Sequence, residues 1–263
     1  MTNFRTGVFV IIALLALVRL EAQEFKNRNL IVAGGGSLPD SVWTTFVQLA
    51  GGTGKKFLAV PQASKRETAG ESIVNKLREL GANHAEILRL SDQEMARQQI
   101  LNADAIWFGG GQQSLLMQRL RDAKVATLIR DRLKDGIVFG GSSAGAAVQS
   151  ELMIAGDKLP VLRGLALWPE VIVDQHFVAR KRFNRSLATI MLHPEKLGIG
   201  IDEGTAALVT EHSFTVIGSS SITVIDARNA RQSGDANGST NSWRDIRVHW
   251  LQPGETFTFK KTP

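Results

Sequence analysis

Short apolar runs alternate with segments of helical pattern over the first half of this chain. The apolar runs are residues 30–33, 56–60, 85–90, 105–108 and 137–139. The segments between them are residues 41–50, 71–82, 91–103 and 114–136. The alternation predicts strands and helices in turn. It favours an α/β fold in which helices cover both faces of a mostly parallel central sheet, which is a three-layer sandwich.

Three of the predicted strands end in glycine-rich loops, at residues 34–36, 109–111 and 140–145. Ligands bind at the carboxyl ends of the strands in such sheets, and glycine lets the backbone approach a ligand closely. We therefore expect a site where these loops meet. The helix of residues 91–103 is expected to begin at a capping box, because Ser91 is followed by Glu94.

The second half of the chain has shorter elements. Apolar runs at residues 171–173, 198–201, 206–210, 214–218 and 221–226 predict further strands, several of them antiparallel. No Pro/Gly/Ser-rich linker divides the chain. We therefore expect a single catalytic domain over residues 23–263.

The N-terminus is typical of a secretory signal. Arg5 precedes an apolar stretch at residues 8–18, which is shorter than the roughly 20 residues that span a bilayer. Cleavage after Ala22 fits, although Leu20 departs from the usual small residue. We expect residues 1–22 to be removed and the protein to be secreted or periplasmic, with no membrane attachment. An uncleaved anchor or a misassigned start codon is the alternative.

Composition excludes several kinds of chemistry. The chain has no cysteine, which rules out a cysteine nucleophile, thiolate metal ligands and disulfides. The net charge of +6 falls to +5 without Arg5, Arg19 and Glu21. The chain has no long Lys/Arg block, so nucleic acid is not expected as a partner. The densest basic cluster, residues 179–185, could be a solvated helix face. No His/Asp/Glu group has metal-ligand spacing, so no metal or other cofactor is expected.

The loop after the strand at residues 137–139 fits the pattern G-x-S-x-G at residues 141–145. This pattern places a serine on a sharp strand-to-helix turn, where backbone N–H groups of the helix start can stabilise an anion. Its register selects Ser143 rather than Ser142. A glycine-rich turn without catalytic function would show the same five residues, so the pattern alone does not decide.

A serine nucleophile needs a base and an acid that orients it. Among the five histidines, His176 follows an apolar strand, as a site residue would. Acidic candidates at strand ends are Asp174, Asp202 and Glu203. A surface or structural role is the ordinary alternative for any single histidine.

Together, these segments resemble the cyanophycinase branch of the S51 serine peptidases, which also includes aspartyl dipeptidase. The resemblance rests on "GGSSAGA" (residues 140–146), "DQHFVARKRFNR" (174–185) and "GIGIDEGTA" (198–206), in that order. The segments "GGGSLP", "VPQAS" and "WFGGGQQ" resemble the same family's earlier loops. The similarity runs from about residue 30 to residue 209. It implies the class I glutamine amidotransferase-like fold.

The resemblance also implies roles for individual residues. Ser143 would be the nucleophile, His176 the general base and Glu203 the orienting acid, with an oxyanion hole at the backbone N–H groups of Gly111 and Ala144. A side chain at Gly111 would be expected to crowd the tetrahedral intermediate. The residues expected around the substrate are Gln113, Asp174, Gln175, Arg180, Arg182 and Arg185.

The arginines are suited to carboxylates, because the planar guanidinium binds them in a bidentate way. Asp174 and Gln175 are expected either to contact a cationic part of the substrate or to order the loop. The sequence departs from the family at Gln112, where an acidic residue is usual. This change is expected to affect which substrate is preferred rather than the chemistry.

The expected activity is serine exopeptidase or isopeptidase cleavage of β-aspartyl-linked peptides, such as cyanophycin to β-Asp-Arg dipeptides. One alternative is an α-aspartyl or isoaspartyl dipeptidase without polymer activity. Another is a non-catalytic binding module on the same scaffold. An ordinary esterase is disfavoured, because its acid should precede the histidine in sequence. A peptide or polymer is the expected partner, and a homodimer is one option for assembly.

Overall fold

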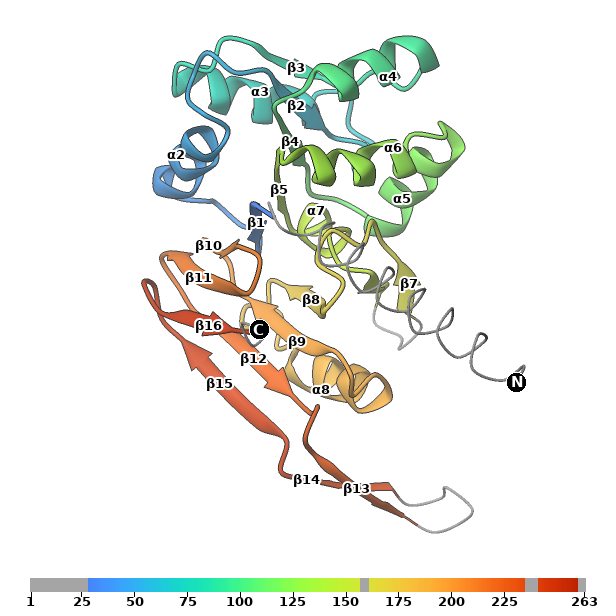
Figure 1. The fold of residues 1–263 in the computed structure, drawn as a ribbon, viewed down its shortest axis with the longest axis vertical. Helices are drawn as coiled ribbons and strands as arrows, with labels where there is room; N and C mark the ends of the chain where they lie inside the picture. The colour runs from blue at the N-terminus through green and yellow to red at the C-terminus, as the bar shows by residue number, and fades with distance from the viewer. Residues whose placement is uncertain (1–27, 157–160, 235–240, 260–263) are drawn as a thin grey trace, which may run out of the picture.

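A computed structural model describes residues 28–156, 161–234 and 241–259 of the chain. The predicted signal segment, residues 1–22, lies outside the described residues. An eight-stranded sheet, in the order β16-β11-β10-β1-β5-β4-β2-β3, forms the centre of the fold (Figure 1). Its strands are β1 (Leu30–Ala33), β2 (Phe57–Val60), β3 (Ala85–Ile87), β4 (Ala105–Phe108), β5 (Val138–Ser142), β10 (Thr205–Val209), β11 (Ser213–Gly218) and β16 (Thr256–Thr258).

The first five strands in sequence run parallel, and the last three add antiparallel strands at one edge. The parallel strands are connected through helices, as such strands require. These are α2 (Asp40–Leu49), α3 (Ala69–Glu79), α4 (Gln93–Asn102), α5 (Gln113–Asp122) and α6 (Ala126–Asp131), with a 3₁₀ turn η1 (Arg132–Asp135).

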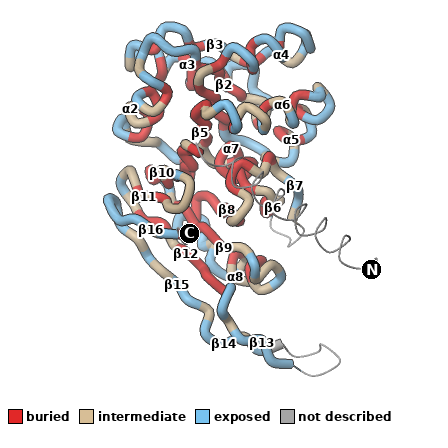
Figure 2. Tube along the Cα trace, in the orientation of Figure 1, coloured by how far each residue is buried: buried red, intermediate tan, exposed pale blue. Residues whose placement is uncertain are grey.

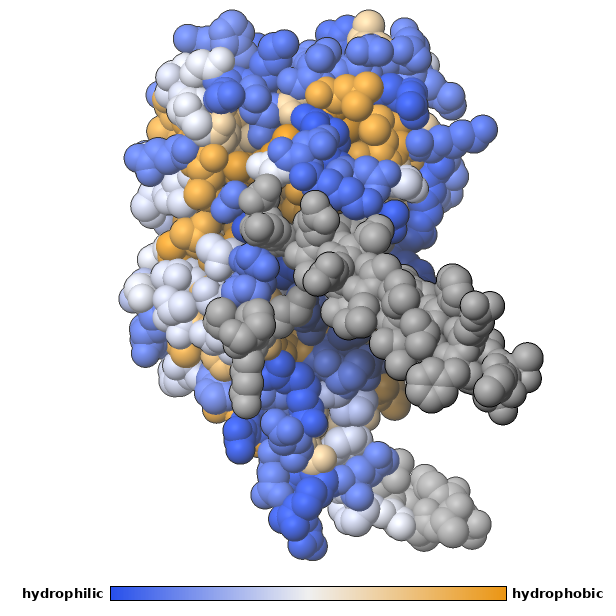
Figure 3. Space-filling model, in the orientation of Figure 1, coloured by the Kyte–Doolittle hydropathy of each residue, from blue (hydrophilic) through white to orange (hydrophobic). Residues whose placement is uncertain are grey.

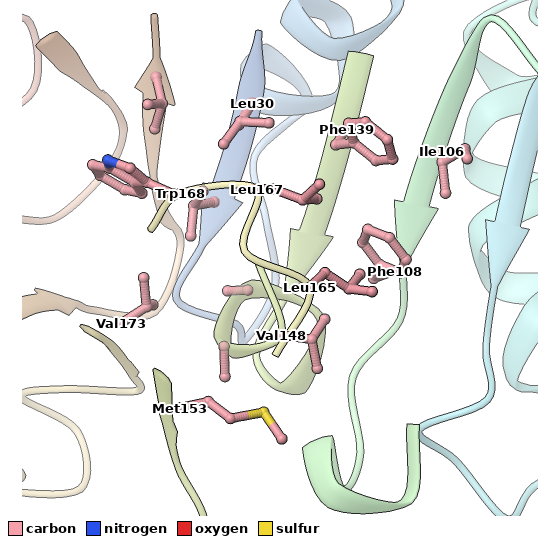
Figure 4. Close-up of a cluster of buried hydrophobic side chains, with 14 of the residues drawn as sticks. Leu30, Ile106, Phe108, Phe139, Val148, Met153, Leu165, Leu167, Trp168 and Val173 are labelled. Carbon is pink, nitrogen blue, oxygen red and sulfur yellow. The ribbon is translucent and has the colours of Figure 1, made fainter. Parts of the chain in front are cut away.

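Both faces of the central sheet are buried under helices. Along β1, Ile31 belongs to a core with α2 and α3, whereas Leu30 and Val32 belong to the opposite core with α4, α5 and α6. Figure 4 shows the core that contains Leu30, where Phe108 lies beside the short helix α7 (Ala144–Ala147) and Phe139 lies next to Phe108, farther from the helix. The predicted three-layer α/β sandwich with a mostly parallel central sheet is confirmed.

A second sheet, which the sequence analysis did not predict, follows in the order β15-β12-β9-β8. Its strands are β8 (Val171–Gln175), β9 (Leu197–Ile201), β12 (Ile222–Asp226) and β15 (Arg247–Leu251), and α8 (Phe183–Leu192) covers one face. The chain passes from β9 in this sheet to β10 in the central sheet through residues 202–204. This short crossing brings the ends of the two sheets together.

A hydrogen bond from Arg228 also links the two sheets. Arg228 binds Asp226 at the end of β12 and donates to the carbonyl of Phe259, which follows β16. The guanidinium lowers the pKa of the Asp226 carboxyl below its ordinary value. Two small ribbons complete the fold: β6 (Leu152–Ile154) with β7 (Val161–Arg163), and β13 (Arg231–Gly234) with β14 (Asn241–Arg244). Figure 2 shows β13 exposed, in contrast to the buried central strands.

Two local predictions are corrected by the structure. The helix expected over residues 114–136 is interrupted, because Lys124 adopts φ 55° in the left-handed region. The amide groups of Lys124 and Val125 donate to the carbonyls of Arg121 and Leu120, which is the Schellman ending of a helix. The cap of α4 is Asp92 rather than Ser91, since the Asp92 carboxylate accepts from the Met95 amide at 3.0 Å.

The described surface in the view of Figure 3 is largely hydrophilic, with apolar groups between the helices. No helix within the described ranges is long and apolar enough to cross a membrane.

Candidate active site

Ser143 lies on a strained turn at the carboxyl end of β5. Its φ of 55° and ψ of −113° fall outside the regions that residues with a side chain ordinarily adopt. The Ser143 amide donates to the carbonyl of Ala33 at the end of β1, and α7 begins at the next residue. Backbone strain of this kind persists only where the surrounding structure enforces it. The turn presents the Ser143 hydroxyl above the end of the sheet, as G-x-S-x-G predicts.

His176 and Glu203 lie in line with this hydroxyl. His176 Nε2 is 2.8 Å from Ser143 Oγ, and His176 Nδ1 is 2.6 Å from Glu203 Oε1. Because a carboxylate accepts only, Nδ1 carries the proton and Nε2 is free to accept from the serine hydroxyl. His176 is only 7% exposed, whereas the Glu203 side chain is 46% exposed. The arrangement can remove a proton from Ser143 and return it to another atom.

Each member of this group comes from a different strand end. Ser143 follows β5 of the central sheet, and His176 follows β8 of the second sheet. Glu203 lies in the crossing from β9 to β10. The His176 amide donates to the carbonyl of Gly34 at 2.9 Å, which fixes the second sheet against the loop after β1. The site therefore forms only where the two sheets meet.

The loop after β1 supports His176, a function that the sequence analysis missed. Gly35 has φ +108°, and a Cβ at this position would lie 2.5 Å from His176 Cε1. The imidazole thus packs directly on the Gly35 backbone. The three consecutive glycines at residues 34–36 indicated that something packs closely on this loop. Only the fold shows that the group packed there is the imidazole of His176.

The loop after β4, residues 109–111, lies on the other side of Ser143. A Cβ built on Gly110 would lie 3.5 Å from Ser143 Cβ. Gly111 has φ +142°, and its Cβ would lie 2.2 Å from the Ala63 carbonyl oxygen. The expected reason for glycine at position 111 is therefore corrected: a side chain would collide with the loop after β2. The oxyanion hole at the N–H groups of Gly111 and Ala144 stays a prediction.

Asp174 is buried and fully engaged with the basic cluster. Its carboxylate accepts from Arg182 at 3.3 Å, from Arg185 Nε at 2.8 Å and from Ser186 Oγ at 2.6 Å. Arg182 also donates to the carbonyl of Gln175. Of the two expectations for Asp174, these contacts match loop ordering. Direct substrate contact by Arg182 and Arg185 stays a prediction, since both guanidiniums are bound to Asp174.

The remaining expected substrate residues differ in exposure. Gln175 is buried at the end of β8. Gln113 is half-buried at the start of α5, and its amide donates to the Ile154 carbonyl at 2.6 Å. Arg180 is exposed one turn after His176, whose carbonyl accepts from the Arg180 amide. Gln112 is exposed at the N-cap of α5, without a side-chain cap bond.

Over the described ranges, no cluster of three or more His, Asp or Glu side chains could hold a metal ion.

Comparison with known proteins identifies the family. The sequence profile of peptidase family S51 matches residues 30–217. The chain belongs to peptidase family S51. A cyanophycinase of Geminocystis herdmanii is 32% identical over 90% of this chain and 96% of its own length. A cyanophycinase of Synechococcus elongatus is 31% identical over 90% of this chain and 81% of its own length.

Two proteins of lower identity are also similar to this chain. Peptidase E of Actinobacillus pleuropneumoniae is 25% identical over 74% of this chain and 91% of its own length. The crystal structure of a peptidase from an acI-B1 Actinobacterium has a TM-score of 0.62 and 21% identity, covering 88% of this chain and 96% of that one. This likeness supports the shared fold. The chain is thus a serine peptidase of the S51 family, as its sequence predicted.

Proposed function

We propose that the chain hydrolyses peptides containing β-aspartyl linkages, with the polymer cyanophycin as the leading substrate and β-Asp-Arg dipeptides as the product. The observation that carries this proposal is the hydrogen-bonded line from Ser143 through His176 to Glu203. The cyanophycinases at 31–32% identity over nine-tenths of the chain support the choice of substrate.

The proposed mechanism is acyl transfer in two halves. Ser143 Oγ attacks the scissile carbonyl carbon while His176 Nε2 takes its proton, and the Glu203 carboxylate stabilises the imidazolium that forms. The tetrahedral oxyanion would accept hydrogen bonds from the N–H groups of Gly111 and Ala144. As the C–N bond breaks, His176 gives its proton to the leaving amine, and an ester on Ser143 remains.

Water completes the cycle. His176 removes a proton from the water as its oxygen attacks the ester carbonyl, and the same proton returns to Ser143 Oγ when the ester bond breaks. One water is consumed, one amide bond is lost, and a free carboxylic acid and a free amine result.

An α-aspartyl or isoaspartyl dipeptidase is the second candidate. Gln112 favours it, because this residue is neutral where the family usually has an acid. The same three residues would act in either case, so the difference lies in what the neighbouring pockets accept.

We further propose that the protein is exported and acts on substrate outside the inner membrane, after removal of residues 1–22. The basic start and the apolar stretch of residues 8–18 motivate this proposal. N-terminal sequencing of the protein purified from its native host is the test. A chain that begins at Met1 would argue against removal.

The test of activity is incubation of the purified protein with insoluble cyanophycin, followed by mass analysis of the soluble products. We expect β-Asp-Arg from the wild type and none from Ser143→Ala, whose hydroxyl is missing. Ser91→Ala, at an exposed serine before α4, is the matched control and should retain full activity. Hydrolysis of α-aspartyl or isoaspartyl dipeptides alone would favour the second candidate, and activity of Ser143→Ala would contradict both.

A further inference from the structure

Arg119, on α5, is bound to the backbone of the loop after β2. Its Nη1 donates to the carbonyl of Gln62 at 3.0 Å and to the carbonyl of Ser64 at 2.8 Å. The side chain is half-buried. A charged donor makes stronger hydrogen bonds than a neutral one. Arg119 therefore fixes the two main-chain carbonyls on either side of Ala63.

The loop after β2 in turn holds the loop after β4, which consists of residues 109–111. The carbonyl of Ala63 accepts from the Gln112 amide at 2.9 Å. The same oxygen lies so close to Gly111 that a Cβ there would be 2.2 Å away. At the other end of the loop, the Gly109 amide donates to the Val60 carbonyl at 3.0 Å. The position of Ala63 thus determines where the backbone of Gly111 lies.

These contacts leave the Gly111 amide free beside the nucleophile. Gly111 is exposed, and no backbone carbonyl among the residues that the structure describes accepts from its amide. A Cβ on the preceding residue, Gly110, would lie 3.5 Å from Ser143 Cβ. Gly111 is one of the two proposed oxyanion donors. Such a donor acts only when it is aimed at the place where negative charge develops, and losing one lowers kcat about a hundredfold to a thousandfold.

We infer that Arg119 is a positioning residue, which aligns the Gly111 amide for the oxyanion through the loop after β2. The inference rests on the proposed function and deepens it. A guanidinium suits this role, because its donors have fixed directions, whereas the ammonium group of lysine is a point charge on a flexible stem. A purely structural role for Arg119 would instead stabilise the fold without affecting the reaction.

Arg132, in η1, provides a matched control at the opposite end of the central sheet. Its guanidinium also donates to two main-chain carbonyls, those of Ile100 at 3.2 Å and Ala103 at 2.8 Å. These carbonyls precede β4, whereas Ser143 follows the parallel strand β5. Arg132→Gln therefore removes comparable bonds far from Ser143. Both Arg119→Gln and Arg132→Gln should shift the urea midpoint of unfolding to a lower concentration.

The first test is the rate at which a fluorophosphonate modifies Ser143, because this reagent reacts whatever the natural substrate is, and its phosphonyl oxygen takes the oxyanion position. Arg119→Gln should react about tenfold to a hundredfold more slowly than the wild type. The loss is smaller than that of a whole donor, since the bonds of Gly109 and Gln112 remain. Arg119→Lys, which can hold one carbonyl, should recover part of the rate. Arg132→Gln should react at the wild-type rate.

The second test is steady-state kinetics on a soluble β-aspartyl dipeptide. Arg119→Gln should lower kcat by a factor similar to its loss in labelling rate. It should change KM by less than about twofold, because the oxyanion forms only in the transition state and not in the bound substrate. Should Arg119→Gln fail to fold, Arg119→Lys decides alone, by rates below those of the wild type.

Three results would overturn the inference and leave the proposed peptidase intact. They are an unchanged labelling rate in Arg119→Gln, an equal loss in Arg132→Gln, and a rise in KM with kcat unchanged. Labelling that depends on Arg119 in a protein that hydrolyses no β-aspartyl peptide would sustain the inference and reject the proposed substrate. A wild type that is not labelled at Ser143 would overturn both.

Discussion

At the scale of single residues, the site depends on how closely the backbone approaches His176. The imidazole is 7% exposed and packs on Gly35, while its two nitrogens contact Ser143 and Glu203. The ring therefore has little room to turn. Displacing it by about 1 Å would lengthen the bond to the serine hydroxyl, and catalysis is sensitive to such displacements.

Gly35→Ala should therefore lower kcat/KM by about a hundredfold or more, because the new methyl group would displace the ring. Gly52→Ala is the matched control. Gly52 has φ +100°, close to the value at Gly35, but a Cβ there would meet nothing within 4 Å. Both variants should lose about 1 kcal/mol of unfolding free energy from backbone strain, and Gly35→Ala should lose more, because its methyl group would collide with the buried ring. Steady-state kinetics measures the effect on activity, and urea unfolding measures the effect on stability. Equal kcat/KM in Gly35→Ala and Gly52→Ala would contradict this account.

The identities of Ser143, His176 and Glu203 could be predicted because their motifs occur in a family order. The residues that hold these three in place could not be predicted from the sequence. The contact of Gly35 with His176 joins residues 141 positions apart, and no local pattern encodes it.

At the scale of elements, the strands were predictable and the helix ends were less so. Apolar runs located β1, β2, β4 and β5, since buried parallel strands are apolar on both faces. Helix ends depend on single hydrogen bonds, which several neighbouring residues can supply. At α4, both Ser91 and Asp92 are suitable caps, and Asp92 makes the bond.

Because Asp92 makes the capping bond and Ser91 does not, substitutions at these two adjacent residues should differ in their effect on stability. Asp92→Ala should lower the unfolding free energy by about 1 kcal/mol, because the Met95 amide loses its acceptor. Ser91→Ala should change it by less than about 0.5 kcal/mol. Urea unfolding of both variants at neutral pH measures this. A larger loss in Ser91→Ala than in Asp92→Ala would show that the capping box predicted from sequence is the one that operates.

At the scale of the whole molecule, two sheets share one site. The central sheet supplies Ser143 and the second sheet supplies His176, and the crossing between them supplies Glu203. The sequence analysis predicted β8, β9 and β12 without predicting that they form a separate sheet. Strand pairing in that half joins segments far apart in the chain, as where β12 pairs with β9 on one side and with β15 on the other.

The central claim is that these three residues form one nucleophilic unit, and covalent labelling tests it most directly. The protein is treated with a fluorophosphonate, and the modified residue is located by peptide mass mapping. We predict a single adduct on Ser143, formed at least about a hundredfold more slowly in His176→Ala. An adduct on another serine, no adduct, or an unchanged rate in His176→Ala would contradict the account.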